Sequence, residues 1–418
     1  MSETFVRNED RGAPLMAQLA ALARHSAEPG AMTRLYLTPA HAAAIETVSD
    51  WMRAAGLDTT VDALGTVVGR LAGPRPDAPT LILGSHIDTI RNGGRFDGTL
   101  GVVVAIAAVA QLRAEGVALP FAIEVVAFGD EEGVRFPHTL SGSRALAGGF
   151  DTAALEGRDA DGVTLREALL HFGRDPEAIA ALARPPGSVM GYLEVHIEQG
   201  PVLEHEDVPV GVVTAIAGAT RLKVEIVGTA GHAGTVPMRL RRDALAAAAE
   251  MVGLVEALAL ADPAVVATVG QIEAQPGAVN VIAGAARLTV DLRSPDDAAR
   301  LAALDRLEDG FAACAARRGV GITVTRFYEV AAAPCGATLQ GVLAEAVSRQ
   351  GLPVVRLPSG AGHDGLAMAR LCPIGMLFVR CTGGISHNPA ESITAADAGV
   401  ALAVLVEAVR AFAATPTG

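Results

Sequence analysis

The sequence has few cysteines and no basic cluster, and both absences narrow the possible functions. Only four of its 418 residues are cysteine, and no two of them have the CxxC spacing of sulfur-ligated zinc sites or redox pairs. Neither a disulfide framework nor a thiolate metal site is therefore expected. The formal net charge is −13 and no Lys/Arg-rich run occurs, so nucleic acid, which binds clustered cations, is not an expected partner.

Neither a targeting segment nor a membrane-spanning segment is expected. The chain starts Met1-Ser2-Glu3 and does not show the basic start, apolar stretch and small-residue cleavage site of a signal peptide. No apolar run approaches the roughly 20 residues that span a bilayer. Together with the expected reduced thiols, these features predict a cytoplasmic protein without a membrane partner.

Apolar sequence, by contrast, is abundant enough for two hydrophobic cores. Half of the residues are hydrophobic, which in a chain of 418 residues favours two domains. β-rich runs at 80–83 and 122–128 are separated by an Ala-rich helical stretch at 101–111. This alternation is typical of a largely parallel sheet covered by helices. Polar clusters at 84–88 and 129–133 follow the two runs, where ligands of such sheets bind.

A different pattern between residues 213 and 330 predicts an inserted domain. The expected elements there are strand 221–227, helix 241–258, strands 265–273 and 286–293, helix 296–318 and strand 322–330. This β-α-β-β-α-β order is that of a ferredoxin-like α+β unit. Residues 1–212 and 331–418 are then expected to form an α/β catalytic domain, with a mixed, largely parallel sheet sandwiched by helices.

Three histidines in polar, glycine-punctuated contexts at expected strand ends are candidate metal ligands. They are His86 in Gly-Ser-His-Ile-Asp-Thr, His196 in Val-His-Ile-Glu-Gln-Gly-Pro and His387 in Gly-Ile-Ser-His-Asn-Pro. Imidazoles with neighbouring carboxylates are typical of transition-metal sites. A single histidine of this kind more often has a structural role, so the hypothesis depends on the three together.

Three carboxylates accompany these histidines. Glycines near Asp97 let the backbone bring its carboxylate close to a ligand, although a helix cap is an alternative role. Glu131 and Glu132 follow an apolar strand whose end should be buried, where adjacent charges would repel each other unless a cation compensates. Neighbouring side chains point differently, so one can bind a metal while the other faces a bound water. A solvated acidic turn is the alternative.

Seven motifs follow one another along the chain: Gly84-Ser-His-Ile-Asp-Thr89, Gly93-Gly-Arg-Phe-Asp-Gly98, Glu131-Glu-Gly-Val-Arg-Phe136, His196-Ile-Glu-Gln-Gly-Pro201, Gly231-His-Ala-Gly-Thr-Val-Pro-Met238, Asp291-Leu-Arg293 and Gly384-Ile-Ser-His-Asn-Pro389. In this order they resemble the hydantoinase/carbamoylase branch of the di-zinc aminoacylase and carboxypeptidase superfamily, across both expected domains. The resemblance implies two divalent metal ions per subunit, zinc or manganese, with nickel and cobalt as further options. It implies that Asp97 bridges the ions, with His86 and His196 at one and Glu132 and His387 at the other.

The same resemblance implies the remaining roles. Glu131 would be the general base, and Asp88 would hold His86 in its ligating tautomer. His232 would reach into a partner subunit's active site and stabilise the oxyanion, which implies a homodimer formed through the inserted domain, acting also as a lid. Without the resemblance, His232 could equally be a turn histidine. The implied substrate contacts are Gln199, Asn280, Arg293 and Arg380, of which the last could also be a solvated strand end.

The reaction implied is hydrolysis of a ureido (N-carbamoyl) C–N bond in a small carboxylate substrate. The segment from Met376 to His387 resembles allantoate amidohydrolases, which form ureidoglycine, ammonia and carbon dioxide in purine catabolism. N-carbamoyl-L-amino acids, 3-ureidopropionate and ureidoglycolate-type compounds remain alternatives. His196, where peptidase relatives carry an acidic ligand, argues against a di-zinc aminopeptidase or aminoacylase. The presence of Glu131 and of every implied ligand argues against a non-catalytic carboxylate-binding protein.

Overall fold

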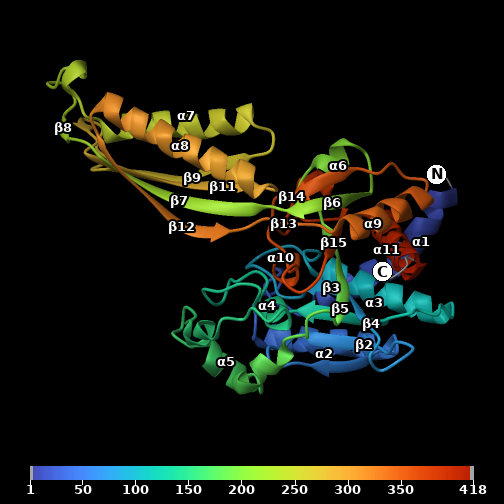
Figure 1. The fold of residues 1–418 in the computed structure, drawn as a ribbon. Coiled ribbons are helices and arrows are strands. Elements are labelled where there is room, and N and C mark those ends of the chain that lie inside the picture. The colour runs from blue at the N-terminus through green and yellow to red at the C-terminus, as the bar shows by residue number, and fades with distance from the viewer. Residues whose placement is uncertain (1–2, 415–418) are drawn as a thin grey trace. The chain divides into compact units, whose positions relative to one another are not determined.

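The computed structural model describes residues 3–414, which form two compact units (Figure 1). The second unit consists of Ala215–Ala333 with Pro358–Gly360, and the first contains the rest of the described chain. Each unit has its own hydrophobic core. The predicted α/β class with a mixed sheet is confirmed, because helices cover a sheet that contains both parallel and antiparallel strand pairs.

A nine-stranded mixed sheet organises the first unit, in the order β1-β2-β4-β3-β5-β15-β6-β13, with β14 paired to β6. The middle strands β4, β3, β5 and β15 run parallel, while β2 and β6 join them in antiparallel directions. The strands are β1 Asp58–Val61, β2 Val67–Leu71, β3 Thr80–His86, β4 Ala122–Phe128, β5 Val189–Ile197, β6 Val210–Ile216, β13 Ala333–Pro334, β14 Arg356–Ser359 and β15 Ile374–Val379.

The parallel strands are mostly apolar because both faces of the sheet are covered. Every residue of β3 and β4 is buried, as expected for strands between two helical layers. Gly84 in β3 permits an unusually close approach to the next strand. A Cβ atom there would lie 2.0 Å from the carbonyl oxygen of Val126, so no other residue fits this position without a shift of the backbone.

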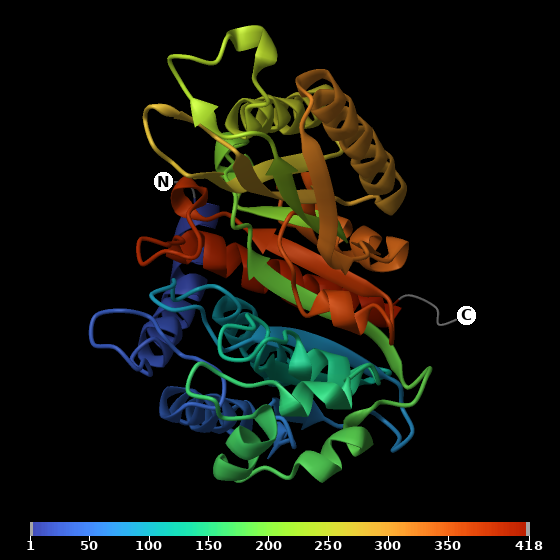
Figure 2. The same ribbon diagram turned by 90° about the vertical axis from the view of Figure 1, so that its left-hand side faces the viewer.

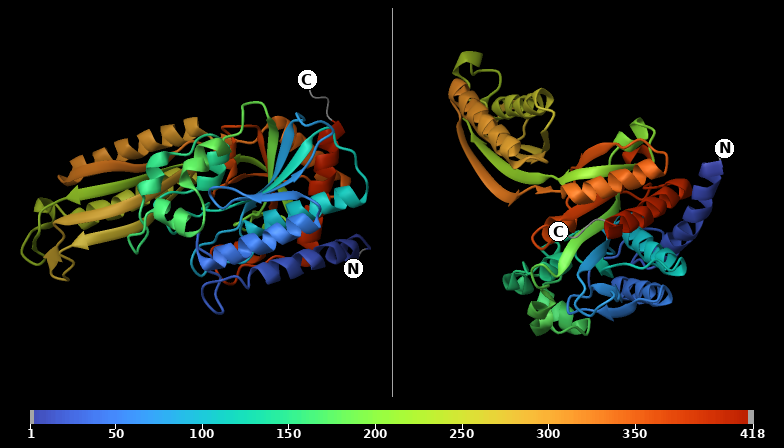
Figure 3. Two further views of the ribbon diagram at one scale, coloured as in Figure 1. Left: turned by 90° about the horizontal axis from the view of Figure 1, so that it is seen from below. Right: turned by 45° about the vertical axis from the view of Figure 1, so that its right-hand side comes forward.

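Helices from opposite ends of the sequence pair with each other in the first unit. α1 (Glu3–Leu22) packs along α11 (Ala395–Ala414), as the dark blue and red helices in the right panel of Figure 3 show. A Cβ atom on Gly12 would fall 1.7 Å from the carbonyl oxygen of Ala395, and one on Gly399 would fall 1.9 Å from that of Asn8. The two helices therefore approach this closely because both positions are glycine. The other α-helices of the first unit outside residues 141–182 are α2 Pro39–Ala54, α3 Thr99–Ala114, α6 Val202–His205, α9 Ala337–Arg349 and α10 Gly365–Met368.

Residues 141–182, in which the sequence offered no interpretable motif beyond residue 150, form a group of short helices (Figure 2). These are α4 Ser141–Leu146, η1 Thr152–Glu156, α5 Leu165–His171 and η2 Pro176–Leu182. α5 begins with a capping box in which Thr164 and Glu167 bond each other's backbone N–H groups. Leu155, Leu165 and Ile179 of this group share a small hydrophobic core with Tyr36 and Leu64.

The second unit contains six main elements in the order β-α-β-β-α-β. They are β7 Gly218–Val227, α7 Ala244–Ala261, β9 Val266–Gln275, β11 Ala285–Ser294, α8 Asp297–Arg318 and β12 Gly321–Val330. The four strands form an antiparallel sheet in the order β12-β7-β11-β9, and both helices lie on one of its faces (Figure 1). Leu222, Val224 and Ile226 alternate toward the helices, which gives the period of two expected for a sheet covered on one side.

Helix α7 contradicts one expectation from the sequence. Its 18 residues include Glu250 and Glu256 but have a mean hydropathy of 1.8, so they reach the length and composition of a membrane-spanning helix. One side of α7, including Ala247 and Met251, packs into the core of the second unit, and 28% of the helix is buried. Leu245 and Leu260 lie on its exposed side. The core helix of a soluble protein can meet the same criteria of length and composition.

Candidate metal centre

Polar side chains follow the carboxyl ends of the parallel strands in the first unit. β3 ends at His86, β5 carries His196 one residue before its end, and the segment after β4 carries Glu131 and Glu132. His387 lies in the loop that follows β15. The strand register aligns the end of β3 with that of β4, and the end of β5 with that of β15. Ligands of α/β sheets commonly bind at this edge.

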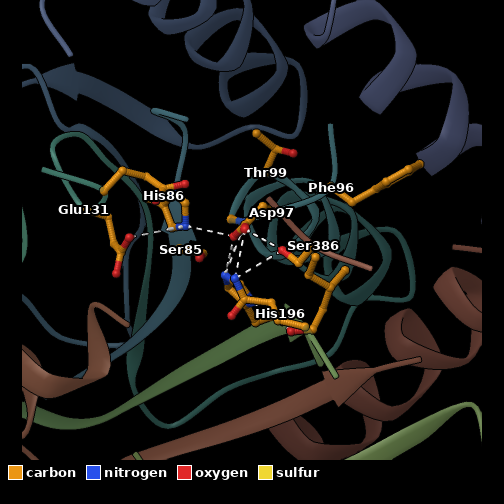
Figure 4. Close-up of polar contacts among 12 residues, drawn as sticks. Ser85, His86, Phe96, Asp97, Thr99, Glu131, His196 and Ser386 are labelled. Atoms are coloured by element: carbon orange, nitrogen blue, oxygen red, sulfur yellow. Dashed lines mark hydrogen bonds and ion pairs between the residues drawn. The ribbon is translucent and has the colours of Figure 1, made fainter. Parts of the chain in front are cut away.

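Asp97 lies between these side chains, and its two carboxylate oxygens face different partners (Figure 4). Oδ1 is 3.5 Å from His86 Nε2 and 3.1 Å from His196 Nε2. Oδ2 is 3.4 Å from His387 Nε2, which is itself 3.6 Å from Glu132 Oε2. Donor atoms bound at about 2.1 Å to one tetrahedral ion lie about 3.4 Å apart. The side chains therefore form two donor sets that share Asp97.

Asp97 does not cap the helix that follows it. The N-cap of α3 is Gly98, with φ 64°, and no side chain bonds the first turn. A Cβ atom at Gly98 would lie 2.4 Å from the His86 ring, so this close approach requires glycine. The Asp97 carboxylate instead accepts hydrogen bonds from Gln199 Nε2 at 2.9 Å and Ser386 Oγ at 3.0 Å. Oδ2 accepts both of these hydrogen bonds, and the Asp97 side chain is directed to the donor cluster and not to the first turn of α3.

Backbone carbonyl groups determine the tautomers of the two buried histidines. His86 Nδ1 is 3.0 Å from the carbonyl oxygen of Asp88, and His196 Nδ1 is 2.9 Å from that of Ile197. Because a carbonyl oxygen can only accept, Nδ1 carries the proton in each neutral ring. Nε2 then presents its lone pair toward Asp97, which is the form of histidine that binds a metal ion.

The carboxylate of Asp88 acts on a different group from the predicted one. Its Oδ1 is 3.7 Å from His86 Nδ1, which is bonded instead to the main-chain oxygen of the same aspartate. The two carboxylate oxygens accept hydrogen bonds from the backbone N–H groups of Glu131 at 3.1 Å and Glu132 at 3.2 Å. The main chain of Asp88 therefore orients His86, and its side chain holds the acidic turn.

Glu131 and Glu132 do not form a solvated turn. Their side chains are only 11% and 7% exposed. Glu131 Oε2 is 3.9 Å from His86 Nε2, whereas Glu132 faces His387, so the adjacent carboxylates point toward different donor sets. His387 is the open side of the cluster, since half of its side chain is exposed.

The charge balance of the cluster favours added cations. Burial raises the pKa of Glu132 to about 7, and the charge of Asp97 adds to this rise. Burial also raises the pKa of Glu131 well above its usual value, an effect that His86 opposes and Glu132 reinforces. Divalent cations would relieve the repulsion among these buried carboxylates. Nitrogen and oxygen donors in this arrangement suit zinc, manganese, nickel or cobalt, so the residues fit the implied metal ions.

Two predicted substrate contacts are engaged by protein groups. Gln199 directs its Nε2 to Asp97, while its Oε1 is buried and has no hydrogen-bond partner within residues 3–414. Arg380 binds Asp397 through Nε at 3.2 Å and Nη2 at 3.0 Å, and Asp207 through Nη1 at 3.0 Å. Two aspartates therefore hold the Arg380 guanidinium, and its role as a substrate contact stays a prediction.

The remaining predicted residues lie in the second unit. His232 is in β8 (Gly231–His232), Asn280 directly precedes β10 (Val281–Ile282), and Arg293 is in β11. β8 and β10 pair in antiparallel directions, and the carbonyl oxygen of Asn280 accepts from the backbone N–H of the residue after His232. His232 and Asn280 are therefore neighbours, whereas Arg293 lies near the opposite end of β11.

Several residues beside the cluster were not predicted from the sequence. The His363 ring lies edge-on to that of His196, with 4.5 Å between the ring centroids. Donor atoms of Glu194, His196 and His363 all lie within 4.8 Å of one another. His363 occurs in Gly-Ala-Gly-His-Asp-Gly, the kind of glycine-punctuated context that identified His86, so its signal was available. Ser386 stands directly before His387 but gave no chemical signal of its own.

Comparisons with known proteins place this geometry in a family. Residues 82–411 match the family model "Peptidase family M20/M25/M40". The chain is 42% identical to the N-carbamoyl-L-amino acid amidohydrolase of Geobacillus stearothermophilus, over 96% of this chain and 98% of the relative. It is 41% identical to the allantoate deiminase of Arabidopsis thaliana, over 93% of this chain and 80% of the relative. A solved hydantoinase/carbamoylase family amidase from Burkholderia multivorans superposes with a TM-score of 0.92 and 36% identity, covering 97% of this chain and 98% of that one. The chain therefore belongs to the M20/M25/M40 peptidase family and, within it, to the hydantoinase/carbamoylase group of amidohydrolases that its motifs predicted.

Proposed function

We propose that the chain is a two-metal amidohydrolase that cleaves a ureido C–N bond in a small, carboxylate-bearing substrate. The observation that carries the proposal is the position of Asp97 between two donor sets, with Glu131 beside them. Allantoate is the substrate we propose first, supported by the allantoate deiminase relative. An N-carbamoyl-L-amino acid is the second candidate, supported by a relative of nearly equal identity. 3-Ureidopropionate is a third option.

In the proposed site, each donor set would hold one ion and Glu131 would be the base. His86 and His196 with Asp97 Oδ1 would hold one ion, and Glu132 and His387 with Asp97 Oδ2 the other. When bound, such ions lower the pKa of a shared water toward about 7 and polarise the scissile carbonyl. Glu131 accepts the water proton as the water oxygen attacks the ureido carbon, and it then gives this proton to the departing nitrogen. The C–N bond breaks, and the released carbamate yields ammonia and carbon dioxide; from allantoate, ureidoglycine remains.

His232 is proposed to stabilise the oxyanion that forms during this attack. Its Nδ1 accepts a hydrogen bond from the backbone N–H of Gly234 at 3.0 Å. The proton of the neutral ring is therefore on Nε2, which makes this exposed nitrogen a donor. A donor aimed at a developing oxyanion contributes more in the transition state than in the ground state.

Arg293 is proposed to bind the substrate carboxylate. Its Nε and Nη2 donate to Asp291 at 2.7 and 2.9 Å, which fixes the plane of the guanidinium. Arg221 donates to the same carboxylate at 2.9 Å. Two guanidinium groups on one carboxylate leave a net positive charge, which favours an anionic ligand. Asn280 and Gln199 are the other proposed polar contacts to the substrate.

We further propose that two copies of the chain form a homodimer through the second unit. α7 exposes Leu245 and Leu260 on the side away from its core. β9 is an edge strand of the four-stranded sheet and exposes Val266 and Ile272. Exposed apolar residues on an unpaired edge strand favour association with another chain. A dimer would also allow His232 to serve the metal centre of the partner.

Mixing two inactive variants tests whether His232 acts across subunits. His232→Ala is expected to lower kcat by about 10²–10³-fold, because one oxyanion donor is lost. If His232 serves the partner, unfolding and refolding a 1:1 mixture of His232→Ala and Glu131→Gln should recover about a quarter of the wild-type rate, since one site in four then has both groups. Ammonia release is measured for the mixture and for each variant treated alone. A mixture no more active than its components would show that each chain supplies its own histidine.

Ammonia release from a panel of substrates tests the proposed reaction. Metal-reconstituted protein is assayed with allantoate, several N-carbamoyl-L-amino acids, 3-ureidopropionate and a dipeptide. We expect the highest kcat/KM with allantoate. Preferred turnover of a carbamoyl amino acid would keep the mechanism and change the substrate, whereas cleavage of the dipeptide alone would identify a peptidase. Silence across the panel would contradict the proposed substrate class.

A further inference from the structure

Glu391 connects two chain segments that carry metal donors. Its Oε1 accepts hydrogen bonds from the backbone N–H groups of Phe96 at 2.8 Å and Asp97 at 3.1 Å, from residues that precede it by 295 and 294 positions. Its Oε2 is 3.2 Å from Ser386 Oγ, and that hydroxyl is also 3.0 Å from Asp97 Oδ2. The side chain is almost completely buried, so its interactions are with the protein and not with bulk water.

A short turn fixes Glu391 relative to His387. The backbone N–H of Glu391 donates to the carbonyl oxygen of Asn388 at 3.0 Å, and that of Ala390 donates to Asn388 Oδ1 at 2.9 Å. The loop after β15 therefore presents His387 at one end of this turn and Glu391 at the other. A carboxylate that bonds the Asp97 segment from this position also sets the distance between that segment and His387.

The space that Glu391 occupies exists because residue 94 is glycine. A Cβ atom on Gly94 would lie 2.0 Å from the carboxyl carbon of Glu391 and 2.0 Å from its Oε1. Any side chain at position 94 must therefore displace the Glu391 carboxylate or the backbone beside it. Gly94 therefore leaves the space in which the Glu391 carboxylate bonds the backbone of Phe96 and Asp97.

We propose that Glu391 is a positioning residue that holds the Asp97 and His387 segments together, so that both donor sets meet at one carboxylate. The hydrogen bonds of Glu391 given above involve no histidine nitrogen of either donor set. Glu391 acts through the main chain of Asp97 and through Ser386. Groups that orient metal ligands in this way commonly change metal affinity by about 10- to 100-fold when they are removed.

Cobalt binding to the metal-free protein tests this proposal without an activity assay. Co²⁺ is titrated into wild-type protein and into Glu391→Ala, Glu391→Gln and Gly94→Ala, with the visible absorption of bound cobalt as the signal. We expect Glu391→Ala and Gly94→Ala each to weaken cobalt binding by about 10- to 100-fold. Glu391→Gln keeps an oxygen that can accept from both backbone N–H groups, so it should bind cobalt within a few-fold of wild type. Glu391→Ala combined with Gly94→Ala should be no weaker than the weaker single variant, because both remove one contact.

Asp62→Ala is the matched control for general destabilisation. Asp62 Oδ1 also accepts two backbone N–H groups, those of Leu64 at 2.8 Å and Thr66 at 2.9 Å, in a turn of the first unit that carries no proposed ligand. This variant should lower the melting temperature and leave cobalt affinity unchanged. The proposal would be overturned if Glu391→Ala bound cobalt with wild-type affinity and only its melting temperature fell, as in Asp62→Ala. It would also be overturned if the double variant lost cobalt affinity by the product of the two single losses. If Glu391→Ala does not fold, Gly94→Ala and Glu391→Gln decide the question by the same criteria.

This inference rests on the proposed metal centre, and the titration separates the two. Wild-type protein that bound no cobalt would overturn both the metal centre and the role of Glu391. Wild-type binding together with unaffected variants would overturn only the role of Glu391.

Discussion

Asp97→Ala is expected to bind neither metal ion tightly and to lose measurable ureido hydrolysis. Asp97 is the one residue shared by both donor sets, at 3.1 to 3.5 Å from the nearest histidine nitrogens of each. Its loss would remove one ligand from each proposed ion and one hydrogen-bond acceptor each from Gln199 and Ser386. Metal-assisted activation supplies several kcal/mol of transition-state stabilisation, so activity should fall by about 10³-fold or more.

Metal content and activity measured on the same sample test this result. Asp97→Ala is dialysed against a fixed low concentration of free metal, and bound metal is then quantified by elemental analysis beside the wild type. Asp97→Asn is the conservative comparison, because it keeps the shape of the side chain but removes its charge. A variant that retained both ions and substantial activity would exclude Asp97 as a shared ligand.

Glu131→Gln is expected to keep its metal ions and lose catalysis. Glu131 lies beside the donor sets, and the amide has nearly the same shape but cannot accept the water proton. A positioned general base contributes about 10²–10⁴-fold to the rate, and kcat should fall by that factor while KM changes little. Single-turnover and steady-state ammonia release with the preferred substrate measure the two parameters.

The neighbouring Glu132→Gln provides the matched control. Asp88 holds both residues through their backbone N–H groups, so the two substitutions disturb the same turn. Glu132 faces His387, and its loss should weaken binding of one ion. If Glu131→Gln lost metal and Glu132→Gln did not, the assignment of ligand and base would have to be exchanged.

The polar clusters at strand ends could be predicted because hydrophobic pattern and chemistry agree there. The apolar runs that became β3 and β4 predicted where the chain would emerge from the sheet, and His86 and Glu131 follow those points. Helix α8 was expected at 296–318 and lies at Asp297–Arg318, since an N-capping aspartate and a glycine after its end bound it on both sides. The positions of these strand and helix ends are therefore determined by the local sequence.

Contacts between distant segments could not be predicted in the same way. The main chain of Asp88, and not its carboxylate, orients His86, and this depends on the path of a loop. Arg380 pairs with Asp397 and Asp207. The motif around Arg380 does not indicate these partners, because neither aspartate belongs to it. Glu391 follows His387 closely in sequence, yet its partners Phe96 and Asp97 lie in the first quarter of the chain.

The close pairing of α1 with α11 has a consequence for the order in which the protein forms during synthesis. The six main elements of the second unit are contiguous in the chain, so that unit can assemble while the remainder is still being translated. The groove into which Gly12 fits is made by residues near Ala395, which are added to the growing chain more than three hundred residues after Gly12. Until then α1 can pack against α3 but lacks its main partner, and apolar surface left exposed in this way favours aggregation of the nascent first unit.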